Sequence, residues 1–476
     1  MQHAIAEPHR RAATLALAIV VFLVTFGDVL VQELHGTAAF YAALAREMLD
    51  RGDPLAPFHG AQAYLLKPPL AFWSSALTSA VLGINDFAMT LPSRLAGLGC
   101  VALTWVLARR LYGPTAGWFA ALVLATNGIY IQFTTNFRMD SLMTFGALLT
   151  LWGYFNPQRA RGAAAFFGGI AVSALTKGPM IFAMLLVFLP HAWATGWRHR
   201  IGRGFLAWAV LLLPPAAWYA YLYLVHGSEL AAQLNYDFWR GDTAIGLSAR
   251  DSALLEYLFK PLRRLWPWLP FMVLAVVYAG MTCLARRTTR LPRADLALLL
   301  GLFLLNYGIA VVKPDPDVRY LYPSLPLVAI FCGGLFSRWT GGRLPRAVAW
   351  SAHALAVLAI ALAVQVSLRG LEDARGLERL RALAASGRIT SANSTVIVDT
   401  LRPPGAPRRN DPMPDSVYYY FGLTPAVILM PATAAALPED ARFVFVRRKR
   451  IHEQALTDLG LVPLGRSAKI ALFARR

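Results

Sequence analysis

A short polar interruption between two apolar segments holds an arginine and an aspartate two positions apart. Arg138 and Asp140 separate the apolar runs 115–133 and 141–155, in a chain that otherwise keeps charge out of such runs. Ionisable groups at membrane segments are costly and usually have a function. A carboxylate can accept the proton of an attacking hydroxyl, and a guanidinium can bind a phosphate through two parallel hydrogen bonds. The pair therefore indicates a site for proton transfer or anion binding.

Other basic residues lie in short polar segments at the ends of further apolar runs. They are Lys67 in Lys67-Pro68-Pro69-Leu70, Lys177 in Thr176-Lys177-Gly178-Pro179, Lys313, and Arg319 in Arg319-Tyr320-Leu321-Tyr322-Pro323. Lysine binds a phosphate as a point charge and arginine as a planar fork. A ring of such cations at a membrane surface suits a lipid-linked phosphate. For each cation alone, the alternative is a snorkelling anchor at a helix end.

Aromatic residues near these motifs are candidate contacts for a sugar ring or a lipid. We nominate Tyr41, Tyr64 and Tyr320, with interfacial anchoring as the alternative for each. The nine histidines are scattered, and His59 and His226 have no partner at metal-ligand spacing. We therefore expect neither a metal nor a cofactor.

The composition indicates that membrane helices position these groups. The 476 residues are 57% hydrophobic and 15% charged, with a mean hydropathy of +0.48, which is typical of a polytopic membrane protein. A hydrocarbon core about 30 Å thick needs about 20 apolar residues per helix. By this ruler we predict about eleven spans, at 12–31, 88–108, 115–133, 141–155, 163–176, 179–196, 205–225, 266–284, 294–312, 321–337 and 347–367. The stretch from Pro68 to Ile84 is interpreted as an interfacial helix.

The net charge of +20 is concentrated in alternate loops between these spans. The arginine-rich loops include Arg109-Arg110, Arg198-His199-Arg200 and the segment from Arg338 to Arg346. This positive-inside pattern predicts a cytoplasmic N-terminus. It places the segments 32–87, 134–140, 176–179, 226–265, 313–320 and 368–476 on the opposite face. No stacking aromatics interleave with the arginines, so nucleic-acid binding is not expected.

From Leu371 onward the pattern changes to that of a small soluble α/β domain. A helical stretch through Ala385 is followed by β-type runs at 394–400, 416–421, 426–430 and 442–446. We therefore predict a mainly α fold with two domains, a transmembrane helical bundle at 1–367 and an α/β domain at 368–476.

The order of the motifs resembles the C-type glycosyltransferases, the polytopic family that includes bacterial lipid A aminoarabinose transferase and protein O-mannosyltransferases. The resemblance covers roughly 12–337 and rests on Ala45-Arg46-Glu47-Met48-Leu49, Gly52-Asp53, Lys67-Pro68-Pro69-Leu70, Arg138-x-Asp140, Lys177-Gly178-Pro179 and Arg319-Tyr320-Leu321-x-Pro323. It implies transfer of a sugar from a polyprenyl phosphate to a hydroxyl of a lipid A-like lipid or a protein, with inversion. It also implies a bacterial inner-membrane location with a periplasmic C-terminal domain.

One departure from the family concerns the catalytic base. The family's usual acidic pair falls on Thr37 and Ala38, neither of which is a carboxylate. Three hypotheses follow: Glu33 takes the role from one helical turn away, Asp140 is the base, or the chemistry of this chain is altered. Under the first two, Lys67, Arg138, Lys177, Lys313 and Arg319 would hold the donor phosphate.

Two other functions fit a polytopic chain with phosphate-binding cations. A polyprenyl-lipid transporter or flippase would place ionisable groups near the membrane midplane, whereas these predicted spans carry their charges at one edge. If the chain were a non-catalytic member of the family, the ring of cations would have no explanation. The sugar and the acceptor do not follow from the motifs.

Overall fold

The computed structural model describes most of the chain, in two compact units. The described residues are 2–29, 32–59, 62–178, 180–239, 265, 267–284, 293–312, 318–398, 413–424, 426–429, 441–448, 454 and 456–475. Unit 1 consists of Met1–Phe26, Leu65–Ala71 and Pro92–Ile360. Unit 2 consists of Gly27–Tyr64, Phe72–Leu91 and Ala361–Arg476.

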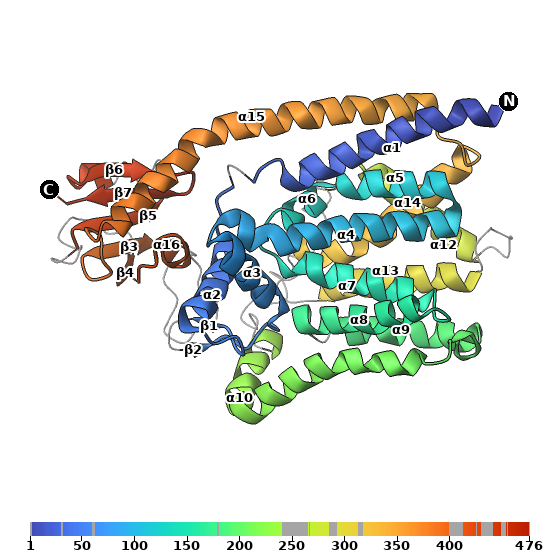
Figure 1. Cartoon of the computed structure of the whole chain (residues 1–476), viewed down its shortest axis with the longest axis horizontal. Helices are drawn as coiled ribbons and strands as arrows, with labels where there is room; N and C mark the ends of the chain where they lie inside the picture. The colour runs from blue at the N-terminus through green and yellow to red at the C-terminus, as the bar shows by residue number, and fades with distance from the viewer. Residues whose placement is uncertain are drawn as a thin grey trace, which may run out of the picture. The chain divides into compact units, whose positions relative to one another are not determined.

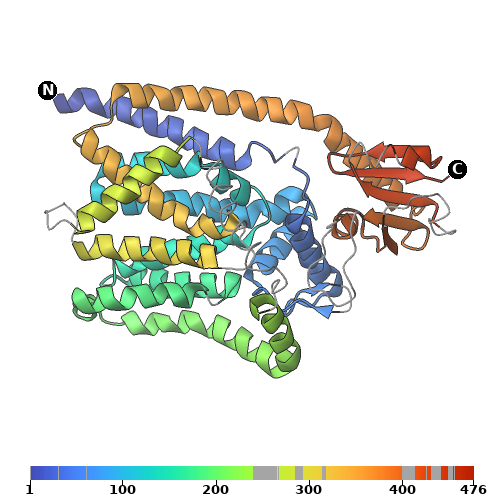
Figure 2. The ribbon, with the colours of Figure 1, turned by 180° about the vertical axis from the view of Figure 1, so that it is seen from behind.

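Unit 1 is helical in the part of it that the structure describes (Figures 1 and 2). Its helices are α1 (Gln2–Phe26), α4 (Asp86–Tyr112, in unit 1 from Pro92), α5 (Pro114–Ala125), α6 (Gly128–Thr134), α7 (Met139–Tyr154), α8 (Ala160–Lys177), α9 (Met180–Ala194), η1 (Trp197–Arg200), η2 (Phe205–Leu212), α10 (Leu213–Trp239), α12 (Leu269–Leu284), α13 (Arg293–Val312), η3 (Val318–Ser324), α14 (Leu325–Trp339) and the first part of α15 (Arg346–Ala385). Figure 2 shows the side of this unit on which α12, α13 and α14 lie, coloured yellow to orange.

The core of unit 1 depends on helices that are apolar on every face. α5 packs along α14, and nearly all residues of both are buried. The rings of Phe119 and Phe336 stack across this contact with centroids 3.9 Å apart. A Cβ on Gly333 would overlap the Ala116 carbonyl, so the missing side chain lets the two backbones approach. Small residues at helix contacts are typical of membrane bundles.

The helices confirm a polytopic helical architecture. Among the described residues, Asp86–Tyr112, Phe205–Gln233, Arg319–Trp339 and Val348–Ser367 are long and apolar enough to cross a membrane. Shorter apolar helices occur at Arg11–Phe26, Leu70–Leu82, Ile181–Ala194 and Leu269–Leu284. The number of about eleven spans stays a prediction.

The span predicted at 115–133 is wrong as a single helix. It comprises α5 and α6, which are bent by 67° at the break between them. Asn127 accounts for the break, because its side-chain oxygen accepts hydrogen bonds from the backbone N–H groups of Ile129 and Tyr130 and so starts a new helix.

Unit 2 contains short helices and a mixed β-sheet (Figure 1). Its helices are α2 (Thr37–Arg51), α3 (Leu70–Leu82, in unit 2 from Phe72), the end of α15 and α16 (Met413–Phe421), and β1 (Phe58–His59) pairs with β2 (Gln62–Ala63). The sheet has the order β4-β3-β5-β7-β6, formed by β4 (Ala426–Leu429), β3 (Ser394–Val398), β5 (Phe443–Arg447), β7 (Ile470–Ala474) and β6 (Val462–Arg466). β3 is parallel to β4 and β5, whereas β7 is antiparallel to β5 and β6.

The strand predicted at 416–421 is wrong, because these residues form α16. The helix packs against both α2 and β3, which favours a helix with two buried faces over the β propensity of its three tyrosines. Arg46 of α2 donates hydrogen bonds to the carbonyls of Tyr418 and Tyr419, at 3.2 and 2.6 Å. A cation at these last carbonyls is favourable for the helix end.

Candidate functional site

Asp140 is the centre of a charged cluster in unit 1. It lies in the first turn of α7, just after Arg138, the N-cap residue with an extended backbone. Its side chain is buried, with 5% of its surface exposed, and Oδ1 lies 2.5 Å from Nζ of Lys177. A buried carboxylate needs a charged or hydrogen-bonded partner, and Lys177 supplies it.

Lys177 reaches Asp140 because α8 ends at this residue and packs along α7. Glycines make the contact close: a Cβ on Gly146 would lie 2.5 Å from the Ser173 hydroxyl. Gly178 then ends α8 with φ +69°, a conformation that glycine adopts readily. The end of α8 therefore places the ammonium group beside the start of α7.

Arg319 and Tyr320 of η3 complete the cluster. The Tyr320 ring is buried, with Nζ of Lys177 at 5.1 Å and Cζ of Arg319 at 5.0 Å from its centroid. Arg319 also donates to the Tyr320 hydroxyl at 3.3 Å. The positive charges of Lys177, Arg319 and Arg138 all act on the Asp140 carboxylate.

Arg138 is held through its backbone. The Ser93 hydroxyl of α4 donates to the Arg138 carbonyl at 2.9 Å and accepts from the Arg138 N–H at 3.3 Å. The guanidinium lies over the Phe133 ring, with Cζ 5.4 Å from the centroid. Arg138 as a whole is half-buried.

A buried hydroxyl network, which we did not predict, ties three elements of the site together. The Tyr322 hydroxyl of η3 bonds Thr134 of α6 at 2.8 Å and accepts from Ser141 of α7 at 3.2 Å. Ser141 follows Asp140 directly, so the network fixes the backbone that carries the carboxylate. Tyr322 does lie in one of the sequence motifs, but hydroxyl pairing across 181 residues has no local signal.

Of the two remaining predicted phosphate ligands, Lys67 and Lys313, the structure describes only Lys67. Lys67 belongs to unit 1 and is half-buried. The next residue, Pro68, lies close to Gly178, with 3.8 Å between its Cγ and a Cβ built on that glycine. The Lys67 segment therefore runs past the end of α8, near Lys177. Lys313 lies outside the described residues.

Glu33 lies in unit 2, where its carboxylate is bonded to the C-terminal part of the chain. Oε1 accepts from the Ser467 hydroxyl at 2.9 Å and from the Lys469 N–H at 3.2 Å. Burial, opposed by the Ser467 hydrogen bond and reinforced by the negative charge of Asp86, raises the pKa of Glu33 to about 7.

Other hydrogen bonds in unit 2 also join the N-terminal part of the chain to its C-terminal part. The hydroxyls of Tyr419 and Tyr420 donate to the Asp86 carboxylate at 2.8 and 2.9 Å. The Leu34 N–H donates to the Tyr420 hydroxyl at 2.5 Å. Glu33 and Leu34 thus lie in a polar network formed largely with residues of α16 and the C-terminal sheet.

Tyr41 and Tyr64 belong to an aromatic cluster of unit 2. Both rings make edge contacts with Phe72, at centroid distances of 5.8 and 6.3 Å, and Phe40 lies 5.3 Å from Tyr64. These contacts are those of packed core rings, and contact with a sugar or lipid stays a prediction for both tyrosines. Within the described residues, no group of three or more His, Cys, Asp or Glu is placed to hold a metal ion.

The sequence matches known transferases over part of its length. Residues 66–219 match the family described as dolichyl-phosphate-mannose-protein mannosyltransferase. An undecaprenyl phosphate-alpha-4-amino-4-deoxy-L-arabinose arabinosyl transferase of Pseudomonas aeruginosa strain UCBPP-PA14 is 30% identical over 351 residues, covering 70% of this chain and 60% of that protein. A second transferase of this description, from Pseudomonas fluorescens strain Pf0-1, is 26% identical over 310 residues, covering 62% of this chain and 54% of that protein. The chain thus spans about 60% of the length of the curated relatives it matches.

The fold is also similar to that of a solved transferase. The crystal structure of ArnT from Cupriavidus metallidurans bound to undecaprenyl phosphate has a TM-score of 0.63 and 15% sequence identity, with 97% of each chain covered. At this identity the likeness concerns the fold. Together with the sequence matches, it confirms the resemblance to the polytopic C-type glycosyltransferases that the motif order predicts.

Proposed function

We propose that this chain is a glycosyltransferase that moves a sugar from a polyprenyl-phosphate donor to a hydroxyl of a lipid or a protein. The observation that carries the proposal is the Asp140–Lys177 pair with Arg319 and Tyr320 beside it. Three helical elements meet there at one end of unit 1. The undecaprenyl phosphate named for the relatives is the donor carrier we assign to the cluster.

The cations would bind the donor phosphate and balance its charge as it leaves. Lys177 and Arg319 face one tyrosine ring from the same cluster, and Arg138 adds a planar fork at its edge. Lys67 and Lys313 are proposed as further ligands of the same phosphate. Such fixed charges stabilise a transition state because they need no reorganisation during the reaction.

The transfer itself needs one proton acceptor. The acceptor hydroxyl attacks the anomeric carbon while the bond from that carbon to the phosphate oxygen breaks. The sugar is inverted, polyprenyl phosphate leaves as the anion, and the hydroxyl proton passes to a carboxylate. Tyr320 is proposed to contact the sugar or the lipid at this point. Tyr41 and Tyr64 are kept as separate candidates for contact with a sugar or a lipid.

Of the two nominated carboxylates, Asp140 is the one we propose as the base. It is surrounded by the cations that would hold the phosphate, and donor binding would draw Lys177 away from it. Glu33 is buried and accepts hydrogen bonds from Ser467 and Lys469, contacts that favour a structural role.

The order of the segments supports an inner-membrane location with the cluster on the periplasmic face. We propose that 1–367 is the transmembrane domain and that 368–476 is a periplasmic domain. The acceptor is proposed to be a lipid A-like glycolipid, with a protein hydroxyl as the alternative. Aminoarabinose is the first donor sugar to test, because the curated relatives are named for it.

Donor binding is the direct test of the cluster. Purified protein in nanodiscs is titrated with undecaprenyl phosphate, and Lys177→Ala is compared with Arg198→Ala, a basic residue of a predicted cytoplasmic loop. Loss of a charge-assisted contact should weaken binding by about tenfold or more in Lys177→Ala alone. Equal affinity of wild type and a folded Lys177→Ala would remove this residue from the site.

Transfer is then tested with undecaprenyl phosphate aminoarabinose and lipid A, with mass spectrometry of the products. Transfer by wild-type protein would support the proposed acceptor. Donor binding without transfer to lipid or protein would instead favour a non-catalytic family member.

A further inference from the structure

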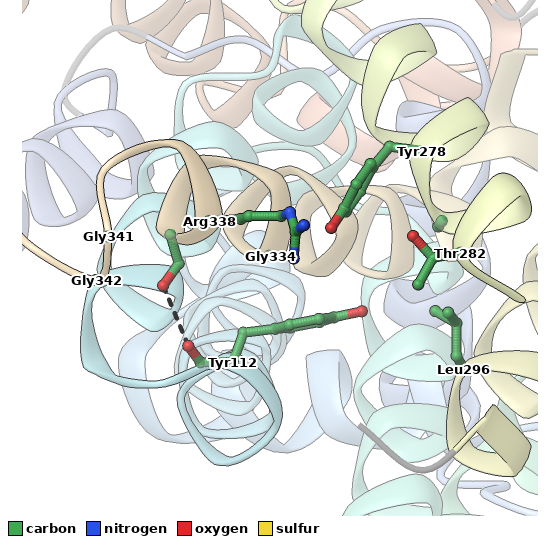
Figure 3. Close-up of a pocket in the computed structure, with 10 residues that line it drawn as sticks. Tyr112, Tyr278, Thr282, Leu296, Gly334, Arg338, Gly341 and Gly342 are labelled. Carbon is green, nitrogen blue, oxygen red and sulfur yellow. Dashed lines mark hydrogen bonds between the residues drawn. The ribbon is translucent and has the colours of Figure 1, made fainter. Parts of the chain in front are cut away.

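A cavity of about 270 Å³ opens in unit 1 where four helices end or begin (Figure 3). Its walls come from Tyr112 at the end of α4, Tyr278 and Thr282 of α12, Leu296 near the start of α13, and Arg338 at the end of α14. None of these residues belongs to the cluster around Asp140.

The cavity lies at the other end of α14 from that cluster. η3, which carries Arg319 and Tyr320, joins the start of α14, and Arg338 lies near its end. The 15 residues of α14 span roughly 22 Å at the rise of an α-helix. A ligand in this cavity would therefore be a different molecule from a donor held by Asp140 and Lys177.

Arg338 gives the cavity a positive charge, and the described residues that line the cavity include no Asp or Glu. Within the described residues, no carboxylate lies within ion-pair distance of its guanidinium. The guanidinium lies over the Tyr278 ring, with Cζ 5.8 Å from the centroid. Figure 3 shows the Arg338 and Tyr278 side chains extending toward one another, with the Tyr112 hydroxyl on another wall. The planar guanidinium can bind two oxygens of a phosphate at once.

Local packing keeps the cavity open and its walls in place. The Ser337 hydroxyl donates to the Tyr112 carbonyl at 3.2 Å, which ties the end of α14 to the end of α4. A Cβ on Gly334 would lie 2.9 Å from the Tyr112 ring, so glycine lets the ring lie flat against α14. The cavity thus combines one cation and several hydroxyls with apolar walls of Ala279 and Leu296.

We propose that this cavity binds the phosphodiester head group of an anionic phospholipid. A volume of about 270 Å³ is that of roughly nine liquid waters, enough for a phosphate with part of its glycerol. The apolar walls lie on helices of a membrane bundle, so acyl chains could continue along them. Arg109 and Arg110, in the last turn of α4, add positive charge at the same helix ends, which attracts anionic lipids to this face.

Native mass spectrometry of the full-length protein can measure lipid binding directly. The detergent-solubilised protein is titrated with phosphatidylglycerol, with the zwitterionic phosphatidylcholine as the reference lipid. We expect Arg338→Gln to weaken phosphatidylglycerol binding by about tenfold or more. Thr282→Phe, which fills the cavity without removing charge, should weaken it as well. Arg343→Gln, in the segment that follows α14 and outside the cavity, should leave it unchanged.

A further titration distinguishes binding of a lipid head group from binding of a free phosphate ion. Inorganic phosphate is titrated alone and as a competitor of phosphatidylglycerol. Binding of phosphatidylglycerol that depends on Arg338 and that millimolar phosphate does not displace supports the lipid. Arg338-dependent binding of inorganic phosphate without lipid binding overturns it. Equal loss in Arg338→Gln and Arg343→Gln also overturns it, because surface charge alone would then account for the attraction.

Discussion

Asp140 and Lys177 come from different helices, and each accounts for the burial of the other. The carboxylate is almost fully buried, and the ammonium is 12% exposed, with 2.5 Å between them. Removal of one partner from such a pair leaves an uncompensated charge, which is strongly destabilising. Every single substitution in this pair is therefore compared with wild type for folding as well as for binding or turnover.

Asp140→Asn should separate catalysis from binding. An asparagine keeps the size of the side chain but cannot accept the hydroxyl proton, so turnover should fall by roughly a hundredfold or more. Donor affinity should not fall, because the phosphate no longer competes with a carboxylate for Lys177. The measurement is steady-state transfer together with donor titration, with Glu33→Gln as the comparison. Normal turnover in Asp140→Asn and a large loss in Glu33→Gln would reverse the assignment.

Glu33 should make stability depend on pH. Burial raises its pKa from an ordinary 4.5 to about 7, so between these pH values the folded state binds more protons than the unfolded state. The free energy of unfolding therefore decreases as pH rises, by on the order of 3 kcal/mol between pH 4.5 and pH 7. Glu33→Gln keeps the oxygen that accepts from Ser467 and should flatten this dependence.

The measurement for Glu33 is thermal unfolding of the detergent-solubilised protein at pH 5 and pH 7.5. Glu378→Gln is the control, because that side chain is 70% exposed. An unchanged pH dependence in Glu33→Gln would show that this carboxylate is already ionised in the folded protein.

At the scale of elements, the crossing of α7 and α8 decides whether Lys177 reaches Asp140. A Cβ on Gly169 would overlap the Gly146 carbonyl and lie 2.5 Å from the Thr150 nitrogen, both on α7. Gly168, its neighbour on α8, has only Leu211 within 4 Å, at 3.7 Å. The two glycines therefore form a matched pair for one substitution.

Gly169→Ala should force the helices apart and destabilise the protein by about 1–3 kcal/mol. Gly168→Ala should be neutral or stabilising by up to about 1 kcal/mol, because alanine favours a helix over glycine. Thermal unfolding measures both, and donor titration should show weaker binding in Gly169→Ala alone. Equal behaviour of the two variants would contradict a close crossing at Gly169.

Helices and strands were predictable from the sequence where the local hydrophobic or β-branched pattern alone determines the structure. The apolar runs predicted most helices, and the β-branched runs at β3, β4 and β5 predicted three strands. The break between α5 and α6 depends on the side chain of Asn127, and α16 depends on packing against α2 and β3. β6 was missed because Pro463 and Gly465 lie within it and lower its β propensity.

At the scale of the whole molecule, the motif order predicted the cluster in unit 1. Arg138, Asp140, Lys177 and Arg319 are all brought together there, because each lies at the end of a helix or a short turn. Glu33 could not be placed from the sequence, because its partner Ser467 lies 434 residues away along the chain. Long-range pairing of this kind depends on the path of the backbone and leaves no local pattern.

Topology is the prediction on which both proposed sites depend. The positive-inside pattern places Asn136, beside the cluster, outside the cytoplasm and Arg343, beside the cavity, inside it. Single cysteines at these two positions, in a chain lacking Cys100, Cys283 and Cys332, can be labelled in intact cells with a membrane-impermeant maleimide. Asn136→Cys should react in intact cells, whereas Arg343→Cys should react only after permeabilisation.

A reporter fused after the C-terminus should give the same side as Asn136→Cys, and one fused at Arg200 the opposite side. These two expectations are linked, because η3, which carries Arg319, directly precedes α14, and Arg338 lies in the last turn of α14. If Asn136→Cys and Arg343→Cys were both labelled from outside, α14 would not cross the membrane and a head-group cavity in the cytoplasmic leaflet would be wrong. If the two sides were exchanged, the cluster would face the cytoplasm and could not act on a periplasmic acceptor.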